Sequence, residues 1–130
     1  MSDLLSSVHA AMSGMQVQAE RLNHTSENIA NADTPGYRRK IIAFQEVMEG
    51  GQHTGLVEAG PVRLDQTELP QIFDPSNPLA DDNGYFAGSN VNLVTEIADA
   101  REAQRSYEAN LKMFDQARQM SRDLLDLLRS

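Results

Sequence analysis

The chain contains no cysteine among its 130 residues. Disulfide bonds, cysteine-ligated zinc and thiol chemistry are therefore excluded together. Tryptophan is also missing, and aromatic residues make up only 5% of the sequence, which is little for the compact core of an enzyme. No apolar run approaches the roughly 20 residues that a membrane-spanning helix requires. These absences disfavour both an enzyme and a protein inserted in a membrane.

Basic residues are scarce as well. The chain has 11 Lys and Arg against 19 Asp and Glu, which gives a formal net charge of −8. Such an excess of negative charge disfavours binding to nucleic acid or to an anionic membrane surface. The length suits one domain with a modest core.

The first residues do not have the composition of a secretory signal. The segment 1–5 carries no basic residue, and the apolar residues after it are spaced rather than continuous. By ordinary rules the chain is expected to stay in the cytoplasm, although a protein exported by a dedicated route without cleavage has the same appearance.

The sequence contains no recognisable catalytic or metal-binding pattern. His9, His24 and His53 do not have the spacing of metal ligands, and there is no nucleophile elbow or phosphate-binding loop. The acidic segment 81–84 has the composition of a calcium loop, but Leu79 stands where the first ligand is required. We therefore expect no catalytic residue, no metal and no cofactor.

Both ends of the chain carry apolar residues at alternating steps of three and four, which place them on one face of a helix. We expect one helix from Ser2 or Asp3 to about Asn31, and another from near Asn90–Asn92 to Leu128. Each apolar face, or seam, is too long for one partner helix to cover, which favours assembly over catalysis. The seam residues assigned to assembly are Leu5, Val8, Met12, Met15, Leu22 and Ile29 in the first helix, and Ile97, Tyr107, Leu111, Phe114, Leu124 and Leu128 in the second.

A specific stop signal follows the first helix. Asn31 tolerates left-handed backbone, and Pro35 moves Thr34 away from helical angles. Pro35 and Gly36 fit the central positions of a type II turn, in which Gly36 has a positive φ. These residues favour a role in turn formation and packing over a role as a binding motif.

The middle of the chain is interrupted by glycine and proline every few positions. The run 41–44 is short and apolar, and either a strand or a turn of helix fits it. Segments 56–58 and 62–64 predict a hairpin around Gly60 and Pro61, and 71–73 predicts a third strand. 

The predicted fold is therefore mainly α. Two long terminal helices pack as a coiled-coil-like pair, with a small β-rich or irregular insertion between them. The parts are the N-terminal helix and its Thr-Pro-Gly turn at 1–36, the middle segment at 37–90 and the C-terminal helix at 91–130, in one structural domain.

Three details of the sequence were open to more than one interpretation. Gly14 lies inside the first helix, where either close approach of a neighbouring helix or simple tolerance explains it. The basic run 38–40 is interpreted as a solvated strand edge. Glu96 and Asp99 are interpreted as part of a solvated helix face, with Glu96 also suited to the positive helix end.

The segment 26–37, Ser-Glu-Asn-Ile-Ala-Asn-Ala-Asp-Thr-Pro-Gly-Tyr, resembles the signature that closes the first axial helix of bacterial flagellar rod, hook and hook-junction proteins. Segments 74–85, 90–92 and 103–110 are similar to proximal-rod members of this family. One departure is Ser89, where the family usually has proline, and we expect it to loosen the start of the second helix. The motif residues that match are Asn28, Ala30, Asn31, Thr34, Pro35, Gly36 and Tyr37.

The resemblance implies a structural subunit of the proximal rod of the flagellar basal body, in the periplasm. It implies export by the flagellar type III apparatus without a cleaved signal peptide. The implied partners are other rod proteins and copies of the chain, which together transmit motor torque and are required for motility. Nucleic acid binding and direct membrane insertion are not expected. The alternatives are another rod or hook-junction subunit, or a small two-helix export chaperone or binding module.

Overall fold

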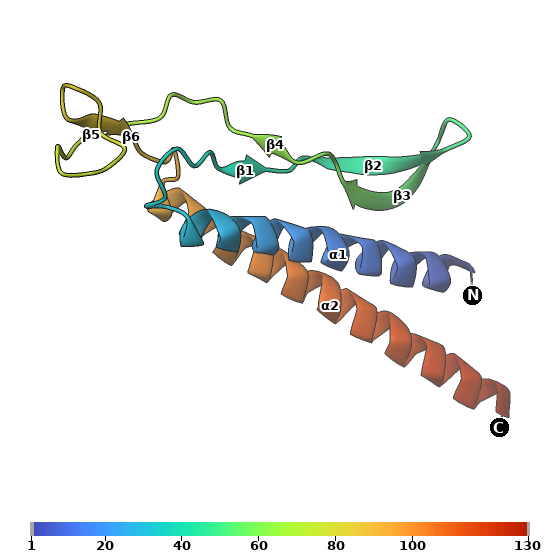
Figure 1. Ribbon diagram of the computed structural model, residues 1–130. Coiled ribbons are helices and arrows are strands. Elements are labelled where there is room, and N and C mark those ends of the chain that lie inside the picture. The colour runs from blue at the N-terminus through green and yellow to red at the C-terminus, as the bar shows by residue number, and fades with distance from the viewer. Residues whose placement is uncertain (1, 130) are drawn as a thin grey trace.

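The computed structural model describes residues 2–129 and is dominated by two long helices (Figure 1). Helix α1 spans Ser2–Ala30 and helix α2 spans Leu93–Arg129, so the sequence placed both helices correctly to within one or two residues. The two helices run antiparallel, and the chain ends lie at the same end of the molecule (Figure 1). In the described residues, neither helix has an apolar stretch long enough to cross a membrane.

Six short strands lie between the helices in sequence and form three separate two-stranded antiparallel sheets. The hairpin of β2 and β3 covers one side of α1, and α2 packs on the other side (Figure 1). Helix α1 is therefore a central layer, whereas α2 is covered on one face only. The strands are β1 (Lys40–Ile41), β2 (Phe44–Glu49), β3 (Gln52–Ala59), β4 (Arg63–Leu64), β5 (Gln71–Phe73) and β6 (Tyr85–Ala87).

The expected hairpin around Gly60 and Pro61 is wrong. Strand β3 pairs with β2, β4 pairs with β1, and β5 pairs with β6 in a sheet of its own. The actual hairpin turns at Gly50 and Gly51, which have φ values of 58° and 78°. A two-residue turn with positive φ at both positions matches the twist of the flanking strands, so this glycine pair sets the register. 

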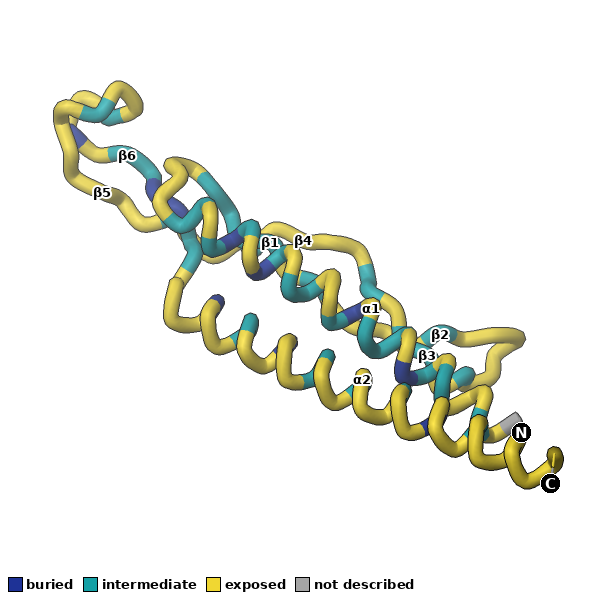
Figure 2. Tube along the Cα trace, turned by 90° about the horizontal axis from the view of Figure 1, so that it is seen from below, coloured by how far each residue is buried: buried dark blue, intermediate teal, exposed yellow. Residues whose placement is uncertain are grey.

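Small side chains form the contact between α1 and α2. Ala11, Ala103 and Ala117 are buried. Of the two explanations for the glycine at position 14, close approach of a neighbouring helix is the correct one. A Cβ placed on Gly14 would lie 2.8 Å from Oδ1 of Asn110 on α2. Small residues let two helix backbones approach closely. Figure 2 shows that most of α2 is exposed, with only isolated buried positions along it.

Six of the twelve seam residues stay exposed, so α1 and α2 cover the predicted seams only in part. Hydrophobic periodicity identifies an apolar face, but it does not show whether that face meets a helix of the same chain. Leu128 is 82% exposed. The exposed seam residues are Leu5, Met12, Ile97, Leu111, Leu124 and Leu128, and the half-buried ones are Val8, Met15, Leu22, Ile29, Tyr107 and Phe114.

Helix α2 begins with a side-chain cap. Oδ1 of Asn92 accepts hydrogen bonds from the backbone N–H groups of Val94, at 3.0 Å, and Thr95, at 3.3 Å. These are two of the N–H groups that the first turn of a helix leaves without a helical partner. The cap fixes where α2 starts relative to the strand β6 before it.

Candidate functional site

The motif residues after α1 form the predicted turn. Gly36 has a φ of 75°, and the N–H of Tyr37 donates to the carbonyl oxygen of Thr34 at 3.2 Å. These are the features of a type II turn with Pro35 and Gly36 at its centre. The N–H of Gly36 also donates to the carbonyl oxygen of Ala87, at 3.1 Å. The turn is thereby attached to β6, close to the start of α2.

Asn28 is the centre of a partly buried group of polar side chains that we call the polar junction, made of Asn28, Tyr37, Arg39, Lys40, Asn90 and Glu96. Its Oδ1 accepts hydrogen bonds from the Tyr37 hydroxyl and from the Lys40 N–H, both at 2.8 Å. Its Nδ2 donates to the Lys40 carbonyl oxygen at 2.9 Å and to Oε2 of Glu96 at 3.3 Å. All four hydrogen-bonding positions of the carboxamide are therefore used, which a buried amide requires.

Tyr37 extends from the turn back to the end of α1. Burial, followed by the nearby charge of Glu27, raises the pKa of the Tyr37 hydroxyl. The hydroxyl therefore stays protonated and remains a donor to Asn28 at neutral pH. The bond spans the turn and holds its two sides together.

Arg39 and Glu96 form the charged part of the polar junction. The Glu96 side chain is only 1% exposed, and its Oε1 lies 2.5 Å from Nε of Arg39. Nη1 of Arg39 reaches Oδ2 of Asp65 at 3.3 Å, and the Arg39 N–H donates to Oδ1 of Asn90 at 2.7 Å. Burial alone would lower the pKa of Arg39, but the hydrogen bonds and charges of Glu96 and Asp65 outweigh it, so that pKa is raised.

Two interpretations of the sequence are corrected here, because Glu96 is buried and the side chains of the basic run 38–40 are partly buried and paired. Nη1 of Arg38 donates to the carbonyl oxygens of Asp65 and Thr67, both at 3.0 Å. Opposite charges that are 57 positions apart meet only after the middle segment has folded back along α1. 

Lys40 completes the basic run by pairing with α1. Its Nζ lies 2.6 Å from Oε1 of Glu27. The hydrogen bond from Lys40 lowers the pKa of the Glu27 carboxyl, and the same bond raises the pKa of Lys40. Both groups are charged at neutral pH, and they attach β1 to the last turns of α1.

The Ser89 side chain connects the start of α2 to the end of α1. Its hydroxyl donates to the carbonyl oxygen of Ala32, and Ser89 is buried. The N–H of Val91 is 3.4 Å from the same hydroxyl oxygen. A proline at this position has no side-chain donor, whereas serine adds a hydrogen bond across the junction. The expectation that Ser89 loosens the helix start relative to proline stays a prediction.

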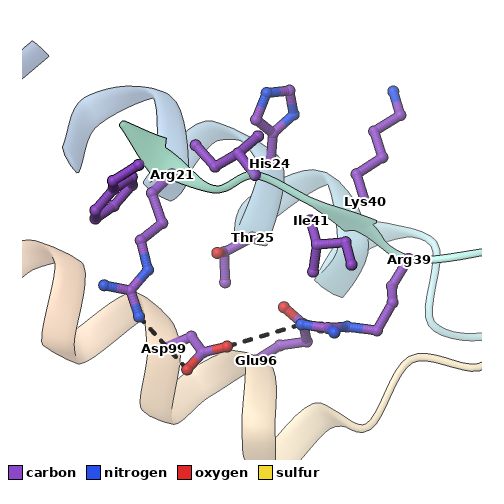
Figure 3. Close-up of a pocket in the computed structure, with 10 residues that line it drawn as sticks. Arg21, His24, Thr25, Arg39, Lys40, Ile41, Glu96 and Asp99 are labelled. Atoms are coloured by element: carbon purple, nitrogen blue, oxygen red, sulfur yellow. Dashed lines mark hydrogen bonds and ion pairs between the residues drawn. The ribbon is translucent and has the colours of Figure 1, made fainter. Parts of the chain in front are cut away.

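A cavity of about 340 Å³ lies beside the polar junction, between α1, α2 and β1 (Figure 3). Arg21 and Arg39 point toward Asp99 from opposite sides, with nitrogen-to-oxygen distances of 3.6 Å and 3.8 Å. The acidic wall residues Glu96 and Asp99 are thus paired with the basic wall residues Arg39 and Arg21. Across residues 2–129 no group of three His, Cys, Asp or Glu side chains is placed to hold a metal ion.

The structure brings together five of the motif residues. Asn28, Gly36 and Tyr37 lie in or beside the junction, and Nδ2 of Asn31 donates to the Glu27 carbonyl oxygen at 2.8 Å. Oγ1 of Thr34 donates to Oδ1 of Asn31 at 3.1 Å. Ala30 and Pro35 are exposed beside them. Sequence reasoning missed the contacts that join Arg39, Asn90 and Glu96. Two signals pointed to them, which are the basic run 38–40 with the acidic start of α2 and the family resemblance of the segment 90–92.

Comparison with known families places these features in a class. The family described as flagella basal body rod protein matches residues 9–38, which include most of α1 and its turn. The family described as flagellar basal body rod FlgEFG protein C-terminal matches residues 82–127, from β6 through most of α2. The fold and these two matches define a flagellar basal-body rod protein.

Relatives that match over nearly their full length show to which family of rod proteins the chain belongs. The chain is 40% identical over 137 residues to the flagellar basal-body rod protein FlgC of Agrobacterium fabrum, covering 100% of this chain and 99% of the relative. It is 36% identical to FlgC of Salmonella typhimurium and 35% identical to FlgC of Escherichia coli O157:H7, in each case covering 95% of this chain and 97% of the relative. The chain belongs to the FlgC family of flagellar basal-body rod proteins, and it is a structural subunit of that rod.

Proposed function

We propose that the chain is a proximal-rod subunit that packs beside copies of itself and other rod proteins and passes motor torque along the rod. Its two terminal helices form the axial part, at 1–36 and 91–130, and the β-rich segment 37–90 lies outside them. The chain reaches the rod through the flagellar type III export apparatus without a cleaved signal, and it acts in the periplasm without catalysis. Membership of the rod protein family supports assembly, and the exposed seams supply a surface for it.

The observation that carries this proposal is the large apolar surface left on α2. Helix α1 covers only one face of α2, and Leu111, Leu124 and Leu128 remain exposed. Monomeric soluble proteins rarely leave apolar side chains in continuous patches of this kind, because each exposed patch promotes association. The seam residues therefore form the surface that neighbouring subunits cover.

The polar junction gives the subunit the stiffness that a torque-transmitting part requires. The end of α1, the turn at Pro35–Gly36, β1, β6 and the start of α2 are joined through Asn28, Arg39 and Ser89. A rotation applied to one helix is then transmitted to the other and to the middle segment without a free hinge between them.

The test places a charge in the seam without disturbing the monomer. Leu111→Asp and Leu124→Asp should each abolish incorporation into rods and swimming, because an unpaired charge in a buried interface costs on the order of several kcal/mol. Arg122→Asp, at an exposed position of the same helix, is the control and should swim normally. Incorporation is measured in purified basal bodies, and export and expression of each variant are measured separately.

Two outcomes would contradict the proposal. Normal incorporation of both leucine variants would show that the seam faces solvent in the rod. A purified chain that forms a tight dimer and never joins rods would instead indicate a two-helix export chaperone.

A further inference from the structure

We propose that the tip formed by β5 and β6 docks on α2 of a neighbouring copy of this chain. The tip comprises Phe73, Leu79 and Tyr85 together with Asp74, Asp81 and Asp82. The groove that receives it is lined by Val94, Ile97, Ala98, Arg101, Glu102 and Arg105. The inference rests on the proposed function, which brings copies of the chain side by side in the rod.

The tip exposes apolar side chains at a point remote from the rest of the chain. Phe73 is 62% exposed and Leu79 is 65% exposed. Phe73 and Tyr85 face each other across the two strands, with ring centroids 5.1 Å apart. Paired aromatic side chains are rigid and bury a large area on contact, so they are frequent anchors of protein interfaces. In both Figure 1 and Figure 2 the tip projects beyond the ends of the helices.

The tip also carries only negative charge. Between Arg63 and Arg101 the sequence contains no lysine or arginine. Oδ1 of Asp74 and of Asp81 accept backbone hydrogen bonds from the loops that follow them, and these bonds hold the two carboxylates in fixed positions. A partner for this surface must therefore combine apolar side chains with positive charge.

The groove on α2 has this combination. Val94 is 78% exposed, and Ile97 beside it is exposed as well. Within residues 2–129 neither Arg101 nor Arg105 forms an ion pair, whereas the charge of Glu102 is offset by Arg21 at 3.4 Å. The groove is thus apolar and basic where the tip is apolar and acidic. Such complementarity selects a partner and orients it.

The tip and the groove of one chain are held apart. The connection between β6 and α2 is fixed because the N–H of Gly36 lies 3.3 Å from the Gly88 carbonyl oxygen and the N–H of Asn90 lies 3.3 Å from the Tyr37 carbonyl oxygen. The tip therefore projects away from its own α2 and is available only to another molecule. A contact between two different surfaces of identical chains repeats from copy to copy and builds a helical array.

Cross-linking tests the contact directly, because the chain has no cysteine of its own. Cells express two differently tagged chains, one with Asn83→Cys at the tip and the other with Ala98→Cys in the groove. A short thiol-reactive cross-linker applied to isolated basal bodies should yield a dimer carrying both tags. The matched control pairs Asn83→Cys with Gln104→Cys, an exposed position of α2 that does not line the groove, and should yield much less of this dimer.

The outcomes separate the contact from the proposed function. If both tagged chains are present in rods but Asn83→Cys links only to itself or to another rod protein, the docking contact is overturned and rod assembly stands. If the unsubstituted chain is itself missing from rods, the proposed function is wrong, and the docking contact that rests on it is wrong as well. 

Charge reversal gives a second, independent test. Arg105→Glu and Asp82→Arg should each reduce swimming and cross-linking, and their combination in one chain should restore most of both. Arg122→Glu combined with Asp82→Arg is the control and should restore neither. If adding Arg105→Glu to the Asp82→Arg chain restores neither swimming nor cross-linking, the proposed contact is wrong.

Discussion

Asn28 and Glu96 are 68 positions apart in sequence, yet Nδ2 of Asn28 lies 3.3 Å from Oε2 of Glu96, and each residue is only 1% exposed. One lies in the last turn of α1 and the other in the first turn of α2. Arg39 binds the other oxygen of Glu96 and so compensates its buried charge. A single hydrogen bond therefore marks the place where both helices and the middle segment are held together.

Asn28→Ala should destabilise the folded chain by about 2–4 kcal/mol, because it removes four hydrogen bonds and leaves partly buried groups of Lys40 and Tyr37 and one oxygen of Glu96 without their Asn28 partner. Urea unfolding followed by circular dichroism measures the change. Asn23→Ala, at an exposed position of the same helix, is the control. Equal effects of the two substitutions would show that the polar junction does not determine stability.

The cost of a substitution at Gly36 should depend only on how well the new residue tolerates a positive φ. No atom lies within 4 Å of a Cβ built on Gly36, but its φ of 75° is strained for branched side chains. We expect Gly36→Val to cost on the order of 1–3 kcal/mol, whereas Gly36→Asn should cost much less because asparagine tolerates this region. Rod incorporation and urea unfolding should rank the variants in the same order. Equal behaviour of valine and asparagine would contradict the turn.

Gly14 and Asn110 should be energetically coupled. In the unchanged chain Gly14→Ala places a methyl group 2.8 Å from Oδ1 of Asn110, so it should destabilise despite its better helix propensity. In the Asn110→Ala background the space is free, and Gly14→Ala should then stabilise by up to about 1 kcal/mol. A double-mutant cycle of unfolding free energies measures this change of sign. Purely additive effects would show that the two helices do not approach closely here.

Acid should weaken the attachment of β1 to α1. Because Lys40 lowers the pKa of Glu27 from its ordinary value of 4.5, the folded chain binds fewer protons than the unfolded chain just below that pH. The stabilisation is therefore fully present above pH 4.5 and is lost as the pH falls through the folded pKa. Glu27→Gln should thus be less stable than the unchanged chain at pH 7, and the difference should shrink in acid.

Urea unfolding at several pH values measures this difference. Glu20→Gln, an exposed glutamate of the same helix, is the matched control. A difference between Glu27→Gln and the unchanged chain that stays constant from pH 7 into acid would contradict the ion pair with Lys40.

Local chemistry made part of the fold predictable. The bounds of α1 and α2 follow from apolar spacing, from the cap at Asn92 and from the turn at Pro35–Gly36, all of which act within a few residues. The strand pairing did not follow, because Gly50–Gly51 and Gly60–Pro61 are both plausible turns. Only the packing of the β2–β3 hairpin against α1 distinguishes them.

The sequence by itself determined two long helices with apolar faces, a fixed turn after the first, and the resemblance to rod proteins. Tertiary structure alone decided which residues lie in the core between the elements, and among them are the small residues Ala11, Gly14 and Ala103. It also decided that Glu96 and Arg39 are buried partners. The physical reason is that burial and ion pairing depend on neighbours distant in sequence, whereas helix formation and turns depend on adjacent residues.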